Sequence, residues 1–245
     1  TLNNQIMEYY LTDNLFIRDN KMYYKNKPVK SHNWQRSLRE YGWEKLPKPW
    51  IRLLNKQLEK PRNNSLFGVI DCGENGNCLF HCISYALKDI EDDTFDAFYL
   101  RTILSENITK EEYEIMITNY RIMYDSGDFD ESWNPHEVTY KRFKDEILKD
   151  SSEYWGDIHL LILLKKYLGI NCVILYSHEI LDTYYYYPLS DDYDPALKTI
   201  VLLYENEIHF KLVGYFMNGT MNVSFTNDTL PYEISKFIKP ETIKS

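Results

Sequence analysis

The order of the apolar segments in the second half of the chain constrains its fold most strongly. Residues 158–168 show an apolar helical pattern that ends at Gly169, a residue type favoured just after a helix. Four runs rich in β-branched and aromatic residues follow, at 171–176, 183–187, 199–204 and 208–213. Because only residues 205–207 join the last two runs, we expect them to form a hairpin. An apolar helix followed by successive strands predicts an α+β fold.

Shorter patterns predict the other elements. Thr109 and Glu112 have the spacing of a capping box, which predicts a helix that begins after Thr109. Pro49 is typical of the first turn of a helix, which we expect over 49–60. By periodicity we further expect a hairpin from 15–18 and 22–24, and helices at 78–87, 95–104 and 138–149, the middle one starting in the acidic run 91–94. An apolar run at 66–70 precedes the loop before residue 78. We also expect a strand at 221–225 and a short helix after Pro231.

Composition and charge limit the class of function. The 245 residues are 44% hydrophobic and 16% aromatic, and no Pro/Gly/Ser-rich linker divides them, so we expect one packed domain. A formal charge of −9 and a pI near 5.2 argue against nucleic-acid binding and favour a basic partner. No signal peptide or long apolar run is present, which predicts no membrane contact, although the start at Thr1 leaves room for an upstream segment.

The cysteines do not form a disulfide pattern. They are unevenly placed at 72, 78, 82 and 172, which favours a reducing compartment and predicts a cytoplasmic protein. Cys72, Cys78, His81 and Cys82 offer a set of soft metal ligands, but structural zinc sites usually combine two separated pairs. We therefore predict neither a metal nor another cofactor.

The stretch from Asp71 to Leu87 carries the strongest chemical signal. Apolar residues recur at helical spacing from Cys78 onwards, so this cysteine is predicted to open a helix. The positive end of a helix dipole favours a thiolate, and the backbone N–H groups of the preceding loop, with Gly73 and Gly76, suit an oxyanion. His209 is a candidate general base, as in thiol proteases. A buried structural cysteine and a hydrogen-bonded sheet histidine are the alternatives.

These residues resemble a known family. Gly76-Asn77-Cys78-Leu79-Phe80, then Tyr154-Trp155-Gly156 before Ile158-His159-Leu160-Leu161, then the strand at 199–204 and Ile208-His209-Phe210 are similar in order to the ovarian tumour (OTU) family of deubiquitinating cysteine proteases. The resemblance covers 66–216 as a catalytic core, with 1–65 and 217–245 as extensions. It implies a papain-like fold, in which a small central β-sheet packs between helices, and hydrolysis of isopeptide bonds at the C-terminus of ubiquitin or a ubiquitin-like modifier.

The resemblance also implies roles for single residues. Cys78 is the nucleophile and His209 the base, and Asn75, Gly76, Asn77 and Cys78 form the oxyanion loop. Trp155, Gly156 and Phe210 are expected at the substrate, and acidic residues (Glu74, Asp157, Asp191 and Asp192) are expected to meet the arginines of the ubiquitin tail. The implied partner is ubiquitin or polyubiquitin, bound by a monomer without a cofactor.

Two positions depart from the family pattern. The family usually has Asp where this chain has Asn75, and often Asn or Asp where it has Lys211. Asp71 is our preferred third catalytic residue, because a carboxylate stabilises an imidazolium better than an amide does, and Asn75 is the alternative. The departures also motivate two other functions: an inactive ubiquitin-binding module on the same scaffold, and a zinc-stabilised interaction domain. The Asn-, Lys-, Ile- and Tyr-rich composition suggests an AT-rich source, such as a large DNA virus or an intracellular microbe whose protein acts in host cytoplasm.

Overall fold

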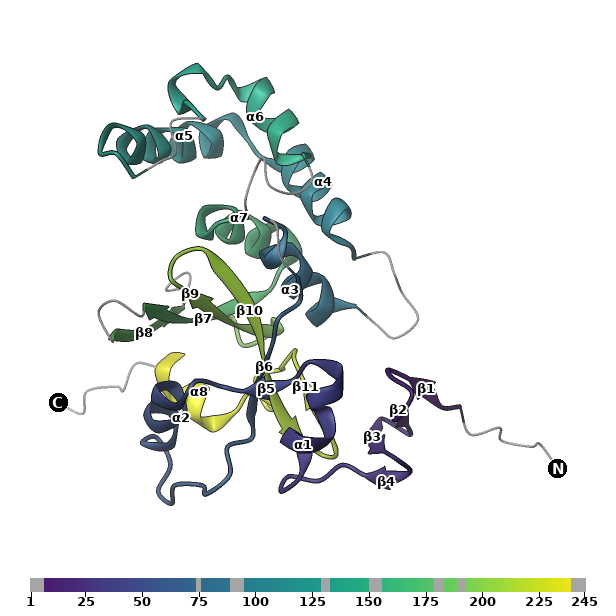
Figure 1. Ribbon diagram of the computed structural model, residues 1–245. Coiled ribbons are helices and arrows are strands. Elements are labelled where there is room, and N and C mark those ends of the chain that lie inside the picture. Colours follow the sequence, from purple (N-terminus) through teal and green to yellow (C-terminus); the bar gives the residue numbers. More distant parts are fainter. Residues whose placement is uncertain are drawn as a thin grey trace. The chain divides into compact units, whose positions relative to one another are not determined.

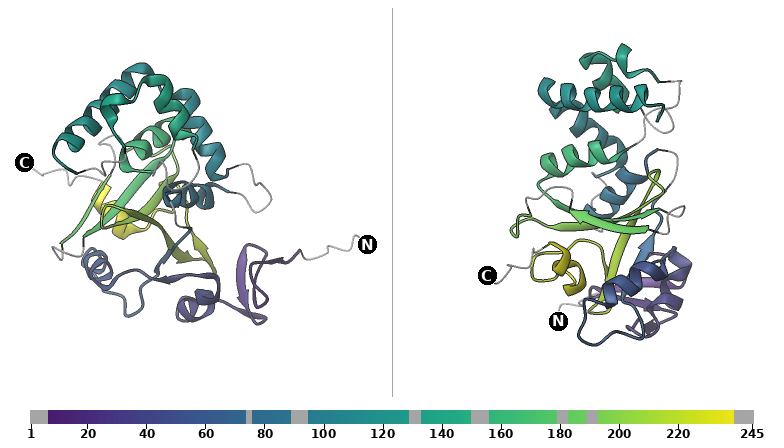
Figure 2. Two further views of the ribbon diagram at one scale, coloured as in Figure 1. Left: turned by 45° about the horizontal axis from the view of Figure 1, so that its top comes forward. Right: turned by 90° about the vertical axis from the view of Figure 1, so that its left-hand side faces the viewer.

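The chain forms two compact units in the computed structural model, which describes residues 7–73, 76–88, 95–128, 133–149, 156–178, 183–188 and 193–238 (Figure 1). One unit combines Thr1–Cys72 with Ile170–Ser245, and the other is Gly73–Gly169. The first holds the strands and the second the longer helices (Figure 2). The expected mixed fold with a central sheet and helices is confirmed.

The central sheet of the first unit contains the predicted strands. Its order is β5 (Glu44–Lys45), β6 (Phe67–Ile70), β10 (His209–Met217), β9 (Thr199–Glu205), β7 (Asn171–His178) and β8 (Thr183–Pro188), and β11 (Thr220–Asn222) pairs with β10. The expected β9–β10 hairpin is confirmed, with His209 opposite Glu205. β10 is also antiparallel to β6, with Leu212 opposite Ile70. The end of β6 therefore lies beside the start of β10.

A smaller sheet contains β1 (Tyr9–Tyr10), β2 (Leu15–Arg18), β3 (Lys21–Tyr24) and β4 (Lys27–Pro28). The predicted β2–β3 hairpin is confirmed, and its turn residues Asp19 and Asn20 have positive φ values of 50° and 57°. Such left-handed pairs suit the twist of two-residue hairpins, and Asn and Asp tolerate them better than most residues. These turn residues therefore allow β2 and β3 to pair directly.

Short helices of the first unit pack on the central sheet. They are α1 (Trp34–Leu38), a 3₁₀ turn at Arg39–Tyr41, α2 (Lys48–Asn55) and α8 (Tyr232–Ile238). The expected end of α2 at residue 60 is wrong, because the helix stops at Asn55. Trp50 of α2 and Ile234 of α8 belong to one buried cluster with Val213 of the sheet. Residues from both proposed extensions thus help to form this core, while the division at 65 and 216 stays a prediction.

The second unit is helical. It contains α3 (Cys78–Leu87), α4 (Ala97–Asn107), α5 (Lys110–Asp125), a 3₁₀ turn at Pro135–Glu137, α6 (Tyr140–Ile147) and α7 (Ile158–Leu168). The predicted capping box at Thr109 and Glu112 is present, and Gly169 ends α7 with a φ of 63°. Asp96 caps α4, and the acidic run expected to start it lies outside the described residues. Within the described ranges, no helix combines the length and apolar character needed to cross a bilayer.

Candidate active site

Cys78 is the first residue of α3, as the sequence predicted. The first helical hydrogen bond joins the His81 N–H to the Asn77 carbonyl at 2.8 Å. Cys78 is a free cysteine and only 2% exposed. At the amino end of a ten-residue helix, its sulfur lies where the helix dipole favours negative charge.

A buried arginine holds the loop that leads into Cys78. Arg101 of α4 is 1% exposed, and its guanidinium donates from Nε to Asn77 Oδ1 at 2.8 Å and from Nη2 to the Gly76 carbonyl at 3.3 Å. A third bond joins Nη1 to the Ile147 carbonyl at 3.0 Å, and the group lies 4.3 Å from the centre of the Phe80 ring. The planar guanidinium thus connects the Gly76–Asn77 loop to α4 and α6 with fixed geometry.

Gly156 also contacts this loop. Its N–H donates to the Gly76 carbonyl at 3.0 Å, and a Cβ at position 156 would lie 2.9 Å from Cε2 of Phe80. Gly76 itself has a φ of 79°, a left-handed value that favours glycine. The glycines therefore permit the close approach of two backbone segments, the loop before Cys78 and the segment at Gly156. The role of Gly156 in binding substrate stays a prediction.

His209 and Asp71 lie together in the first unit. Nε2 of His209, the first residue of β10, is 2.9 Å from Oδ2 of Asp71, which directly follows β6. Both side chains are partly exposed. A carboxylate at Nε2 requires the proton on that nitrogen, and Nδ1 is then the basic nitrogen. The pair has the chemistry of a general base with an orienting anion.

Neighbouring residues have structural partners. Lys211, in the position where the family often has Asn or Asp, forms an ion pair with Glu205 at 2.7 Å across β9 and β10. Phe210 was expected at the substrate, but its ring is fully buried and stacks on Tyr204 with centroids 4.1 Å apart. Such a ring has no surface with which to contact a substrate, so we assign Phe210 to the sheet core.

Asp157 caps α7. Its Oδ1 accepts from the Leu160 N–H at 2.8 Å, and its Oδ2 accepts from the Tyr120 hydroxyl. Burial raises the pKa of Asp157 above its ordinary value, although these two donors favour the charged form. The internal bonds explain the position of Asp157, and its expected contact with a substrate arginine stays a prediction.

Comparison with known proteins gave matches among solved structures alone. No family model and no curated protein sequence matches the chain. The chain is similar to an ovarian tumour (OTU) domain in complex with ubiquitin, at 18% identity over 70% of this chain and 82% of that one, with a TM-score of 0.42. The Hazara virus OTU bound to ubiquitin gives 16% identity over 62% and 83%, with a TM-score of 0.41. An OTU deubiquitinase from Wolbachia pipientis wMel gives 18% over 70% and 96%, with a TM-score of 0.38.

Because these TM-scores are below 0.5, we base the proposed function on the motifs and the geometry of the site. Among the predicted site residues, Glu74, Asn75 and Trp155 lie outside the described residues, as do Asp191 and Asp192. In the described part of the chain, no three or more metal-binding side chains lie close enough together to hold a metal ion. This result covers Cys72, Cys78, His81 and Cys82, which are all described.

Sequence reasoning missed one residue that shapes the site, Arg101. The available signal is an arginine among apolar residues in the predicted helix at 95–104, where Leu100 and Leu104 are both buried. A charged residue on a buried helix face requires specific partners. Its partners, Gly76 and Asn77, are more than twenty residues earlier in the chain, and spacing alone does not identify them.

Proposed function

We propose that this chain is a cysteine protease of the OTU family that hydrolyses the isopeptide bond at the C-terminus of ubiquitin or a related modifier. The observation that carries the proposal is the His209–Asp71 pair at 2.9 Å. It supplies an oriented base in a chain that also has a cysteine at the amino end of a helix. The ordered motifs around Cys78, Gly156 and His209 direct the proposal to ubiquitin.

In the first half of the proposed reaction, His209 Nδ1 takes the proton from Cys78 Sγ. The thiolate attacks the carbonyl carbon of the C-terminal glycine, and the carbonyl electron pair moves to oxygen. Backbone N–H groups at Cys78 and in the loop before it donate to this oxyanion. Asp71 stabilises the imidazolium formed at the same time. Arg101 holds the loop through the Gly76 carbonyl and the Asn77 amide, so it is a positioning residue.

In the second half, the imidazolium gives this proton to the lysine nitrogen while the carbon–nitrogen bond breaks. This step leaves a thioester on Cys78 and releases the amine. His209 then deprotonates a water molecule, which attacks the thioester carbon and breaks the carbon–sulfur bond, and the imidazolium gives this proton to the departing sulfur. The products are a free modifier carboxylate and a regenerated thiol.

Surface properties of the chain suit a protein substrate. Ile115 and Ile122 of α5 are 64% and 60% exposed, and a spacing of seven residues places them on one helix face. Exposed apolar side chains of this kind often mark protein contacts. The net charge of −9 complements a modifier tail that carries arginines. We propose that α5 contacts the folded part of the modifier.

A ubiquitin derivative with a C-terminal electrophile tests the proposed activity. The wild-type chain should gain the mass of one ubiquitin, Cys78→Ala should gain none, and His209→Ala should react much more slowly at neutral pH. Absence of an adduct with the wild type would refute the proposal. Saturable ubiquitin binding without an adduct would support the non-catalytic module instead. Reaction with a ubiquitin-like electrophile alone would reassign the modifier.

A further inference from the structure

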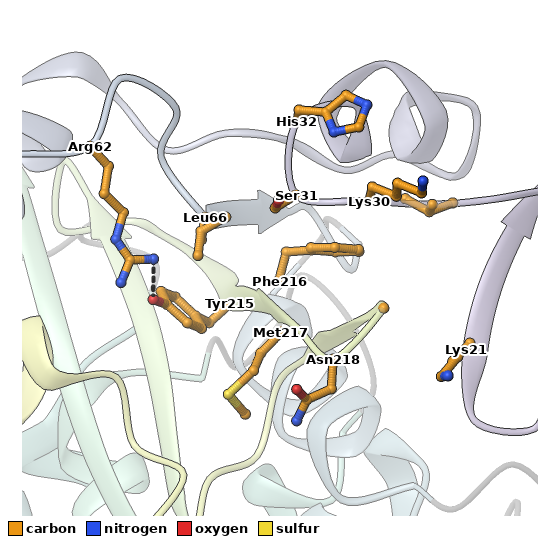
Figure 3. A pocket seen from close by; sticks show the side chains of 12 residues that line it. Lys21, Lys30, Ser31, His32, Arg62, Leu66, Tyr215, Phe216, Met217 and Asn218 are labelled. Carbon is orange, nitrogen blue, oxygen red and sulfur yellow. Dashed lines mark hydrogen bonds between the residues drawn. The ribbon is translucent and has the colours of Figure 1, made fainter.

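A pocket of about 840 Å³ lies in the unit that contains the two sheets (Figure 3). Its walls come from the start of β3, the segment 29–32, the chain just before β6, and the turn between β10 and β11. None of these segments contains a residue of the proposed catalytic mechanism. A volume of this size is in the range of specific ligand pockets.

The pocket is basic in an acidic protein. Lys21, Lys30, His32 and Arg62 line it, and none of its lining residues is Asp or Glu. The whole chain has 37 acidic residues against 28 Lys and Arg. A wall with cationic and no anionic side chains is therefore a local reversal of the net charge, and it favours an anionic ligand.

The basic side chains of the pocket have no acidic partner within the described residues. Lys21, Lys30, His32 and Arg62 form no ion pair there. Arg62 donates to the hydroxyl of Tyr215 at 2.7 Å (dashed in Figure 3), a bond to a neutral group that orients the guanidinium without neutralising it. The positive charge of the pocket is consequently available to a ligand.

Some cationic side chains elsewhere in the chain have acidic partners. Lys166 pairs with Glu112 at 2.7 Å, and Lys211 pairs with Glu205 at the same distance. The charges of these two lysines are neutralised by carboxylates of the same chain. Within the part of the chain that the structure describes, the pocket lysines have no such acidic partner.

The positive groups are spread along the pocket. Figure 3 shows Arg62 on one side and Lys21 on the opposite side, with the apolar side chains of Leu66 and Phe216 between them. A site for one phosphate group brings its donors together at a single point. Separated cations around an apolar floor instead suit an extended ligand, with several carboxylates and an apolar side chain between them.

We propose that this pocket binds an acidic peptide segment of a protein partner. An apolar side chain of the segment contacts the partly exposed Leu66 and Met217, and flanking carboxylates meet Arg62, Lys30 and Lys21. The arginine-bearing tail of ubiquitin would be repelled by the same surface, so the partner is a different polypeptide. The inference is independent of the proposed protease activity.

Fluorescence anisotropy with a labelled peptide tests the proposal. The probe carries two Glu residues on each side of a Leu-Phe pair, and a matched peptide has Gln in place of Glu. The wild-type chain should bind the acidic peptide saturably, more weakly at high salt, and should not bind the Gln peptide. Arg62→Gln and Lys30→Gln should each weaken binding about 2- to 5-fold, as expected for exposed ion pairs.

Control variants separate the pocket from general charge effects. Arg62→Lys keeps the charge and should retain binding within about 2-fold, and Lys56→Gln, an exposed lysine that does not line the pocket, should leave it unchanged. Equal losses for Lys56→Gln and Arg62→Gln would overturn the proposal, as would no saturable binding. Displacement of the peptide by millimolar inorganic phosphate, or full binding after Leu-Phe is replaced by Ser-Ser, would leave a simple anion site and also overturn it.

Discussion

Oδ2 of Asp71 lies 2.9 Å from Nε2 of His209, and the two residues stand at the adjoining ends of the antiparallel strands β6 and β10. The strand register therefore delivers the carboxylate, with no contribution from the residue two positions after the histidine. Lys211 occupies that position and is paired with Glu205. Asp71 therefore has the geometry of an orienting acid despite the departures from the family pattern, and we propose it as the third catalytic residue.

Substitution at Asp71 tests this role. Asp71→Asn keeps the shape of the side chain but loses its charge, so we expect kcat/KM to fall about 10²- to 10⁴-fold for hydrolysis of a ubiquitin C-terminal fluorogenic amide. Asn75→Ala should cost less than about tenfold if that residue only shapes the loop. A larger loss for Asn75→Ala would give the third role to Asn75. Wild-type rates in both variants would place the orienting group elsewhere.

Arg101 should couple the stability of the second unit to the reactivity of Cys78. Arg101→Met leaves the acceptors at Gly76, Asn77 and Ile147 without their donor. We therefore expect the free energy of unfolding, measured in urea titrations, to fall by about 3–5 kcal/mol. Arg101→Lys keeps the charge but lacks the planar set of donors. We expect it to remain folded, with a lower kcat and a nearly unchanged KM.

A control distinguishes positioning by Arg101 from simple destabilisation. Phe143→Leu alters the buried core of α6 in the same unit, where the Phe143 ring packs against Tyr113 and Tyr120. A core substitution of this kind should cost about 1–2 kcal/mol of stability. Its kcat should stay close to wild type at a temperature where it is folded. An equal loss of kcat in Phe143→Leu and Arg101→Lys would contradict the positioning role.

Local signals in the sequence predicted most of the longer elements, and longer-range contacts were harder to foresee. The start of α3 at Cys78, the capping box of Thr109 and the end of α7 at Gly169 each depend on residues within one helical turn. The partner of His209 was only preferred among alternatives, because Asp71 is 138 residues away and strand register decides their meeting. Arg101 was missed because its acceptors are backbone and amide groups that carry no pattern.

The apolar face of α5 should matter for a folded modifier and not for a small substrate. The double variant Ile115→Asp, Ile122→Asp should raise KM for ubiquitin substrates about tenfold or more, because two exposed anchors in one contact commonly contribute over 1 kcal/mol. Alkylation of Cys78 by iodoacetamide should be unchanged. Ile162→Asp, at an exposed position of α7, is the matched control. Equal effects of both changes on KM would remove α5 from the proposed interface.

Glu112 should make the stability of the second unit depend on pH. Burial alone would raise the pKa of Glu112, but hydrogen bonds from Lys166, Thr109 and Tyr167 outweigh it and lower the pKa from 4.5 to about 2. Because the pKa of Glu112 is lower in the folded state, the stabilisation is complete above pH 4.5 and disappears as the pH falls towards 2.

The variant Glu112→Gln tests this pH dependence. Because the Glu112 side chain is only 14% exposed, the substitution should lower the free energy of unfolding by up to about 3 kcal/mol at pH 7 in urea titrations. This difference from wild type should shrink at pH 3, whereas Glu111→Gln in the same helical turn should cost little at either pH. A cost for Glu112→Gln that does not change between pH 7 and pH 3 would show that the carboxylate charge does not hold α5 to α7.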